Sequence, residues 1–284
     1  MDCILVNDRT YVREFISFGG KCPYKCKHCY TFIPGYKYDA EASVDSLVQP
    51  LTTIPHVDIV YVSGHKECFV NPDEGISLCE KIYSVAPCDI LFTTRNCFST
   101  SHIDRLSKLN EIMRRNGHFL FGCISIPALY SYTKIENPDI VPSPEDRMNT
   151  LEALHGKGII TLLTVRPLFH SCFIPITEPL EIINRCSSFS NAVLSSGLVK
   201  SSYISDALGY PANQKMKDKR EIMKCLNQQD IIVEYCDVSE ELSTLERFCS
   251  EKAIPLFCEK TTSDAESISL EAVDYLKRNM QICI

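Results

Sequence analysis

The sequence has no apolar run long enough to cross a membrane and no excess of positive charge. None of its hydrophobic stretches reaches the roughly 18 to 20 residues that a membrane-spanning helix needs. The first residues, Met1-Asp2-Cys3, lack the basic and apolar regions of a signal peptide. A net charge of −7 offers phosphate groups no general binding surface. We therefore expect a cytoplasmic protein that binds neither membranes nor, non-specifically, nucleic acids.

The chain also lacks internal repeats, low-complexity segments and recognisable linkers. Its 284 residues, 45% of them apolar and 23% charged, suit one large soluble α/β domain. Sixteen cysteines in a reducing compartment are expected to be thiols or metal ligands. Outside one short loop they are scattered, and most have apolar neighbours that suit small buried side chains. A second metal cluster at Cys236, Cys249 and Cys258 is disfavoured by their wide spacing.

Three cysteines do lie close together. Cys22, Cys26 and Cys29 follow a run, 11–18, that alternates like a strand. A loop with this spacing can turn three thiolates towards one point, which leaves one iron of a [4Fe–4S] cluster without a protein ligand. Zinc and ferredoxin patterns supply a fourth ligand nearby, and this loop does not. A structural metal loop is the alternative.

The same residues carry a family resemblance. Cys22-x3-Cys26-x2-Cys29, with Tyr24 inside and His28-Cys29-Tyr30 at its end, resembles the signature of the radical S-adenosylmethionine (SAM) enzymes. The resemblance implies that SAM chelates the open iron of a [4Fe–4S] cluster. One electron then cleaves SAM to methionine and a 5′-deoxyadenosyl radical, which abstracts hydrogen from a substrate. It also implies an electron donor, such as a reductase, a flavodoxin or a ferredoxin.

Strands and helices alternate along the first 200 residues. We expect further strands at 57–62, 89–93, 118–126, 159–165 and 192–195, with helices between them. Such alternation implies parallel strands joined by right-handed crossovers. Six such units form a partial (β/α)6 TIM-like barrel in the family that the loop resembles, and we expect this core over residues 1–200.

Residues 201–284 are expected to form a C-terminal α/β extension packed on the same domain. The pattern predicts a loop at 201–217, a helix from the charged run near 215 to 226, and strands at 230–234 and 254–257. It also predicts helices at 239–250 and 264–280. The extension is expected to add about two strands to the edge of the sheet.

The ends of the strands are where ligands bind in parallel α/β architectures. Ser63 and Gly64 end the second strand, and glycine permits close backbone approach, although a plain turn is the alternative. Arg95 ends the third strand and would pair with a carboxylate through two parallel bonds. Ser125 ends the fourth. His65 and His170 also fall at strand ends facing this region.

The order of these motifs along the chain is similar to that in the spore photoproduct lyase-like branch of radical SAM proteins. Thr93-x-Arg95-Asn96, Ser125-Ile126, Glu136 and Pro144-x2-Arg147 carry the likeness. The resemblance implies that Ser63, Arg95 and Ser125 meet SAM, and we assign Gly64 and His28 to the cofactor site with them. Three roles stay open for Arg147: an exposed helix residue, an internal salt-bridge partner of Glu136, or a residue of the site.

The chain departs from spore photoproduct lyase itself, although not from the branch. Tyr61 stands where the resemblance places that enzyme's hydrogen-returning cysteine, and His28 stands where that enzyme has a tyrosine. With the acidic charge, these differences argue against repair of DNA lesions. The substrate is not identified, and two alternatives stay open: radical-based repair or modification of nucleic acid, and a non-catalytic iron–sulfur or zinc protein.

Overall fold

The main sheet is a curled half-barrel built from most of the chain. The computed structural model describes residues 2–7, 9–64, 66–211, 216–222, 232–258 and 267–281. Its larger sheet has eight strands in the order β1-β2-β3-β4-β5-β6-β7-β11. The strands are β1 (Asp2–Val6), β2 (Arg9–Ile16), β3 (Ile59–Val62), β4 (Asp89–Thr94), β5 (Leu120–Ser125), β6 (Ile160–Leu168), β7 (Ala192–Gly197) and β11 (Leu256–Cys258).

Parallel pairing from β2 to β11 brings all their carboxyl ends to one edge. Among the described strands of this sheet, only β1 runs antiparallel, against β2. The register sets Tyr61 opposite Leu91, Leu91 opposite Phe121, and Phe121 opposite Ile160, so these side chains form one level across the sheet. The predicted partial (β/α)6 TIM-like barrel is therefore confirmed.

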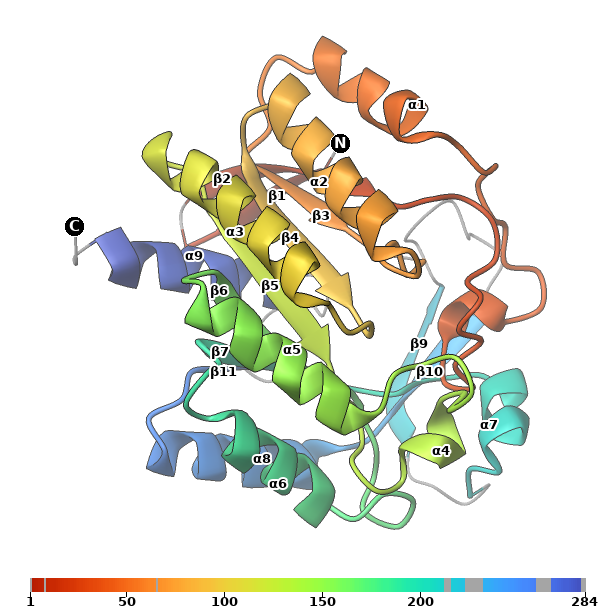
Figure 1. Ribbon diagram of the computed structural model, residues 1–284. Helices are drawn as coiled ribbons and strands as arrows, with labels where there is room; N and C mark the ends of the chain where they lie inside the picture. Colours follow the sequence, from red (N-terminus) through yellow and green to blue (C-terminus); the bar gives the residue numbers. More distant parts are fainter. Residues whose placement is uncertain are drawn as a thin grey trace.

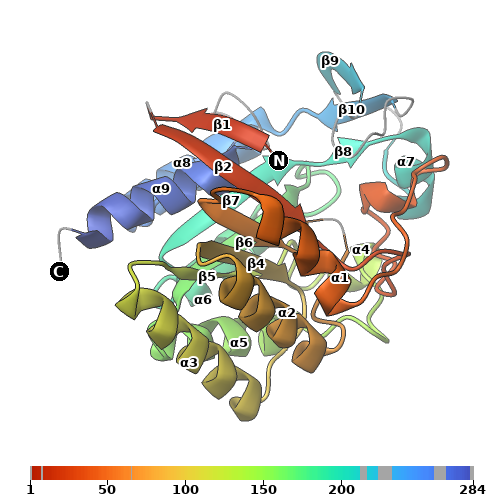
Figure 2. The ribbon, with the colours of Figure 1, turned by 90° about the horizontal axis from the view of Figure 1, so that it is seen from above.

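Most helices cover the convex face of the sheet, as Figures 1 and 2 show. They are α1 (Val44–Val48), α2 (Pro72–Val85), α3 (Thr100–Arg115), α5 (Pro144–Gly156), α6 (Thr177–Cys186) and α8 (Ser239–Glu251). Two short helices, α4 (Tyr132–Ile135) and α7 (Ser202–Leu208), lie beside the end of the barrel that carries the cysteine loop. A large apolar core fills the space between the sheet and the covering helices.

The concave face of the sheet is covered by the last helix, α9 (Ile268–Gln281). Its apolar side chains pack in one buried cluster with inward-facing residues of the strands. The members of this cluster include Tyr11, Ile59, Tyr61, Leu91, Phe121, Leu162, Leu194, Ile268, Val273 and Leu276. The inside of the half-barrel is thus packed at one end and carries polar side chains towards the carboxyl edge.

Helix starts follow local capping chemistry. The Ser143 side chain accepts from Asp146 N at 3.2 Å, and Pro144 occupies the first turn of α5, as the sequence predicts. Asn71 caps α2 in the same way, and its first turn carries Asp73 and Glu74. These caps set where α2 and α5 begin.

The C-terminal extension differs in part from the expectation. Residues 202–208 form α7 rather than a loop, and β9 (Met216–Ile222) is a strand where a helix was expected. β10 (Ile232–Cys236) pairs with β8 (Val199–Lys200) and β9 in a separate three-stranded sheet. Among the described residues only β11 extends the main sheet, so the expected addition of two strands is wrong by one.

The scattered cysteines in the described part of the chain are thiols and not disulfides. Most are buried, as expected: Cys68, Cys79, Cys88, Cys123, Cys186, Cys236, Cys249 and Cys258. Cys3, Cys97 and Cys172 are exposed. Cys225 and Cys283 lie outside the described residues. In the part of the chain that is described, no helix has both the length and the apolarity to cross a membrane.

Candidate functional site

The cysteine loop leaves β2 at the carboxyl edge of the sheet, and two glycines shape its start. Gly20 has a positive φ of 78° and donates its N–H to Asp39 O at 2.9 Å. A Cβ on Gly19 would lie 1.9 Å from Ala40 O. Only glycine therefore allows the segment at 39–40 to cross so closely over the start of the loop.

The middle of the loop is held by its own backbone and by α4. Cys29 N donates to Cys26 O at 3.0 Å, which closes a tight turn between two of the cysteines. Lys27 N donates to Ile135 O at 2.9 Å. The loop is thereby fixed against a segment more than a hundred residues later in the chain.

The three thiols belong to one small cluster. Tyr24, Cys26 and Val141 form its buried centre, and Cys22 and Cys29 pack against it. The Cys22 thiol accepts the backbone N–H groups of Glu67 and Tyr24, and Cys29 Sγ lies 3.0 Å from Thr31 Oγ1. Spacing alone predicted that these side chains converge, and the structure brings them together.

Burial disfavours bare thiolates in this cluster. It raises the pKa of the Cys26 thiol to about 12, and the nearby Arg95 guanidinium is the main opposing effect. Burial also raises the pKa of Cys22. Thiolates at these positions need a positively charged partner, and an iron cluster would supply one. The donor set therefore fits the three-cysteine ligation expected from the sequence.

His28 joins the loop to Arg95. Its Nδ1 lies 3.2 Å from Ile135 O, a contact that requires a proton on Nδ1. Nε2 is then the acceptor for Arg95 Nη2 at 3.3 Å. Burial first, and the Arg95 charge second, lower the pKa of His28 to about 3. The imidazole is therefore neutral at physiological pH.

Glu136 is a buried carboxylate shared by two arginines. Arg95 Nε donates to Glu136 Oε1 at 3.0 Å, and Arg147 Nη2 donates to Oε2 at 2.6 Å. The side chains of Glu136 and Arg147 are fully buried, whereas that of Arg95 is 26% exposed. Burial raises the pKa of Glu136, but Arg147 and Arg95 outweigh it and hold that pKa below its usual value. Of the alternatives for Arg147, the internal partner of Glu136 is the one observed.

Ser125 carries an unsatisfied hydroxyl at this point. Arg147 Nη1 donates to Ser125 O at 2.7 Å, which fixes the end of β5. The Ser125 side chain is 2% exposed, and within the described ranges its Oγ has no hydrogen-bond partner. A buried hydroxyl without a partner costs free energy, so a bound polar group would relieve it. This fits the SAM contact expected of Ser125.

Ser63 and Gly64 form a turn next to the loop. Ser63 has a positive φ of 72°, and its Oγ accepts from Cys68 N at 2.9 Å. Tyr30, the last residue of the cysteine signature, donates its hydroxyl to Gly64 O at 3.2 Å. The Ser63 hydroxyl thus holds the turn, and its contact with SAM stays a prediction. His65 lies outside the described residues.

Glu67 was not singled out from the sequence. Its Oε2 accepts from Arg95 N at 2.8 Å, and its Oε1 accepts from Thr94 Oγ1 at 2.8 Å. Burial raises the pKa of Glu67. Its own backbone N–H reaches the Cys22 thiol, so this one residue ties the end of β4 to the cysteine loop. The available signal was the polar run 63–67 directly after an apolar strand.

His170, at the other predicted strand end, faces the C-terminal extension. Its Nε2 lies 3.8 Å from Glu241 on α8, and its backbone N–H donates to Tyr210 at 3.3 Å. The neighbouring Phe169 ring lies 6.1 Å from His28, edge to face. His170 is thus one residue away from the site contacts rather than among them.

Cys26, His28 and Glu136 form an alternative set of possible metal ligands. Ligand atoms of Cys26, His28 and Glu136 lie within 4.8 Å of one another. Both Glu136 oxygens already accept from arginines, however, and His28 Nε2 accepts from Arg95. Two guanidinium groups disfavour a further cation here, so this set does not suit a zinc ion.

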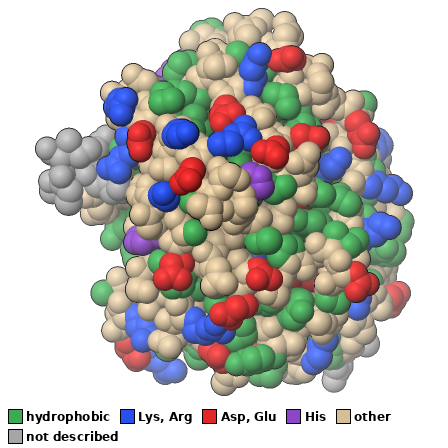
Figure 3. Space-filling view, in the orientation of Figure 1, with side chains coloured by type: hydrophobic (Ala, Val, Ile, Leu, Met, Phe, Trp, Pro, Cys, Tyr) green, Lys and Arg blue, Asp and Glu red, His purple; other side chains and the backbone are tan. Residues whose placement is uncertain are grey.

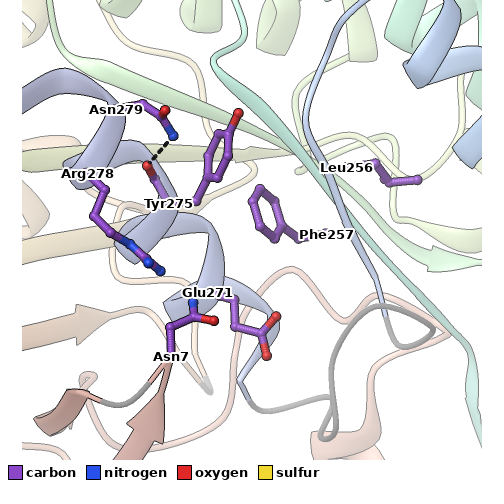
Figure 4. Close-up of a pocket in the computed structure, with 7 residues that line it drawn as sticks. All are labelled: Asn7, Leu256, Phe257, Glu271, Tyr275, Arg278 and Asn279. Atoms are coloured by element: carbon purple, nitrogen blue, oxygen red, sulfur yellow. Dashed lines mark hydrogen bonds between the residues drawn. The ribbon is translucent and has the colours of Figure 1, made fainter. Parts of the chain in front are cut away.

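A separate cavity of about 510 Å³ has none of Cys22, Cys26 and Cys29 in its lining. Figure 4 shows the side chains that line it, from α9, β11 and the turn after β1: Asn7, Leu256, Phe257, Glu271, Tyr275, Arg278 and Asn279. Asn7 precedes the amino end of β2, whereas the cysteine loop follows its carboxyl end. The cavity therefore opens at the opposite end of the half-barrel, and the convergent polar groups around the cysteines mark the stronger candidate site.

Solved structures with this fold were found, although no protein-family model and no curated protein matches the sequence. A spore photoproduct lyase variant with bound AdoMet (SAM) and a dinucleoside spore photoproduct superposes with a TM-score of 0.58 at 14% identity, over 86% of this chain and 75% of that chain. SuiB of Streptococcus suis bound to S-adenosylmethionine gives a TM-score of 0.57 at 12% identity, over 88% of this chain.

The two matches differ in how much of the matched protein they cover. The chain spans about half of SuiB, 51% of its length. Another structure shows SuiB bound to its precursor peptide SuiA, with a TM-score of 0.55. Spore photoproduct lyase and SuiB are both radical SAM enzymes. By its structure, this chain has the fold of the radical SAM enzymes.

Proposed function

We propose that the protein is a radical SAM enzyme in which Cys22, Cys26 and Cys29 ligate a [4Fe–4S] cluster. The observation that carries the proposal is the convergence of three thiols, with no fourth in their cluster among the described residues, at the carboxyl edge of a parallel half-barrel. When bound, such a cluster supplies the electron that cleaves SAM reductively. The chain's part is to bind, orient and shield.

Arg95 and Ser125 are proposed to hold SAM beside the cluster. Arg95 is partly exposed and offers a cation to a carboxylate, while Glu136 and His28 fix its direction. Ser125 offers the unsatisfied hydroxyl described above. Ser63 and Gly64 are proposed to line the same site through the turn that Tyr30 ties to the loop.

The first experiment is anaerobic reconstitution with iron and sulfide, followed by dithionite and SAM. We expect 5′-deoxyadenosine and methionine by chromatography. In Cys26→Ala both products and most of the bound iron are expected to vanish while the circular dichroism spectrum is unchanged. Cys79→Ala, which removes a buried thiol from α2, serves as the matched control and should keep both.

Two results would contradict the proposal. If Cys26→Ala cleaves SAM normally, the loop does not hold the catalytic cluster. If iron binds but SAM neither alters the spectrum of the cluster nor is cleaved, the loop is structural or electron-carrying.

The substrate is not assigned. The neighbouring folds were solved with a dinucleoside in one protein and a precursor peptide in another, so the fold serves unlike substrates. Membership of the spore photoproduct lyase-like branch is proposed from the order of motifs, supported by the fold. At the position of Tyr61 this chain has a phenol on the concave face of the sheet rather than a thiol.

A further inference from the structure

Thr31 lies two residues after the last cysteine of the loop and contacts its sulfur. Thr31 Oγ1 is 3.0 Å from Cys29 Sγ, and the residue is only 2% exposed. Thr31 is the middle residue of a single 3-10 turn, Tyr30–Phe32, that begins directly after Cys29. Phe32 N donates to Cys29 O at 3.2 Å and closes this turn. The turn and the branched side chain together fix the hydroxyl beside the sulfur.

The direction of this hydrogen bond follows from the chemistry of the sulfur. In the free protein either atom can donate. A cysteine that ligates iron is a thiolate and carries no proton. With iron bound at Cys29, the Thr31 hydroxyl is therefore the donor and Cys29 Sγ the acceptor.

A side-chain donor differs from the donors at the neighbouring ligand. The Cys22 thiol accepts the backbone N–H groups of Tyr24 and Glu67. Those donors belong to the main chain and stay in place when a side chain is replaced. The Thr31 hydroxyl can be removed by one substitution, and its contribution can therefore be measured.

The hydrogen bond lies where water is scarce. The Tyr38 hydroxyl donates to Thr31 O. The Tyr38 ring packs on Tyr36 with 5.1 Å between ring centres, and Tyr36 lies 6.1 Å from Tyr30. In such surroundings a hydrogen bond to a charged acceptor has a larger electrostatic effect than at an exposed surface.

We propose that Thr31 is a positioning residue that raises the reduction potential of the cluster by donating from Oγ1 to Cys29 Sγ. The proposal rests on the proposed function, because only a cluster on Cys29 has a potential to adjust. Hydrogen bonds to the ligand sulfurs are among the factors that set the potentials of iron–sulfur clusters. Reduction adds negative charge, so a donor at a sulfur stabilises the reduced form more than the oxidised form.

This effect can be measured without any change of charge. Net charge also influences the potential of a cluster, and on the face seen in Figure 3 acidic and basic side chains are interspersed over the helices. Thr31→Val removes the hydroxyl, keeps the branched shape and leaves all of these charges in place. A shift of the potential in this variant therefore reports on the hydrogen bond.

The test is a redox titration of the reconstituted full-length protein without SAM. Dithionite supplies one electron per cluster, no atom is transferred, and electron paramagnetic resonance measures the reduced form. In Thr31→Val we expect the ratio of reduced to oxidised cluster at a fixed potential to fall about tenfold. For one electron this is a shift of the midpoint by about 59 mV to more negative values. Thr31→Ser keeps a hydroxyl and should restore most of the wild-type midpoint.

Thr164 provides the matched control. Its Oγ1 lies 2.7 Å from Cys123 Sγ, both residues are buried, and Cys123 is not one of the proposed ligands. Thr164→Val should therefore leave the midpoint unchanged. Iron content and circular dichroism are measured for each variant. If Thr31→Val loses iron, Thr31→Ala carries the titration, and loss of iron in both gives Thr31 a structural role and overturns the proposal.

The remaining outcomes separate this proposal from the proposed function. An unchanged midpoint in Thr31→Val, with full iron content, overturns the role of Thr31 and leaves the proposed function intact. Equal shifts in Thr31→Val and Thr31→Ser overturn it as well, because the hydroxyl is then not the cause. Absence of 5′-deoxyadenosine with dithionite and SAM in the wild type overturns the proposed function itself.

Discussion

The Ser125 hydroxyl is expected to contribute to SAM binding and not to the stability of the free protein. Ser125 Oγ is buried without a hydrogen-bond partner among the described residues, so removing it should not weaken the fold of the free protein. We expect Ser125→Ala to unfold in urea at or slightly above the wild-type midpoint. If SAM supplies the missing partner, its Kd should rise about tenfold, or about 1.4 kcal/mol, by equilibrium dialysis with the reconstituted protein.

Ser195 provides the matched control. It is also buried, but its Oγ donates to Val165 O at 3.0 Å. Ser195→Ala should therefore lose about 1 kcal/mol of unfolding free energy without changing the Kd for SAM. A loss of stability in Ser125→Ala, with SAM binding unaffected, would mean that this hydroxyl has a structural partner and no cofactor role.

Glu136 is expected to be the most sensitive charged residue of the site. Glu136→Gln leaves Arg147, which is fully buried, without its ionic partner. Removing one partner of a buried pair costs about 3 to 5 kcal/mol, because the other charge stays buried and uncompensated. Urea denaturation of the free protein measures this loss.

An exposed pair shows what the same chemical change costs at the surface. Glu145 pairs with Arg185, and the two side chains are 57% and 36% exposed. Glu145→Gln should change the unfolding free energy by less than about 1 kcal/mol. If the two variants lose similar amounts, the network around Glu136 does not organise the fold of the site.

At the scale of elements, the Asp274 carboxylate ties α9 to β2 and to the turn before it. Asp274 accepts from the Tyr11 hydroxyl at 2.7 Å and from Asn7 Nδ2 at 3.0 Å, and it pairs with Arg278. Burial raises the pKa of Asp274, but these donors outweigh it and hold the pKa below its usual value of 3.8. Ionised Asp274 therefore stabilises the fold above that pH, and the stabilisation is lost as pH falls through the lower, folded-state pKa.

Asp274→Asn tests this anchor. Its amide nitrogen would face other donors, so we expect a loss of about 1 to 3 kcal/mol at pH 7. The difference from the wild type should shrink as the pH of the denaturation experiment is lowered to about 3. Asp104→Asn, at the exposed pair with Lys157, should have little effect at either pH. A difference that is independent of pH would show that packing, not charge, is what Asp274 contributes.

Elements that depend on local signals were predictable. The bounds of α2 follow from Asn71, Pro72 and the acidic first turn, and α5 follows from Ser143 and Pro144. The strand β9 was not predictable in this way. It pairs with β10, a partner that local propensity does not reveal.

In the candidate site, too, only the residues that are grouped by local sequence were predictable. Spacing along the chain was enough to group Cys22, Cys26 and Cys29. The carboxylate of Glu67 was missed, because its partners come from β4 and become neighbours only in the folded sheet. The choice between the alternatives for Arg147 likewise needed the position in space of Glu136, the residue directly after α4.

At the scale of the molecule, α9 completes the apolar core on the concave face of the main sheet. α9 packs on inward-facing residues of strands from β2 to β7, so the extension closes the concave face opposite the outer helices. We propose that residues 1–200 form the radical SAM core and that 201–284 are packed on it as one domain. One cooperative unfolding transition in calorimetry is then expected for the full chain.

A substitution on the buried face of α9 should therefore unfold more than that helix. Val273 is fully buried against the sheet, and an uncompensated aspartate there is expected to cost about 3 kcal/mol or more. In Val273→Asp we expect the single calorimetric transition to move to lower temperature as a whole, and near-ultraviolet circular dichroism to follow it. Asn279→Asp, at an exposed position of the same helix, should leave the transition in place. If Val273→Asp instead splits the transition in two, with residues 1–200 melting as before, the barrel core folds on its own and the extension is a separate unit.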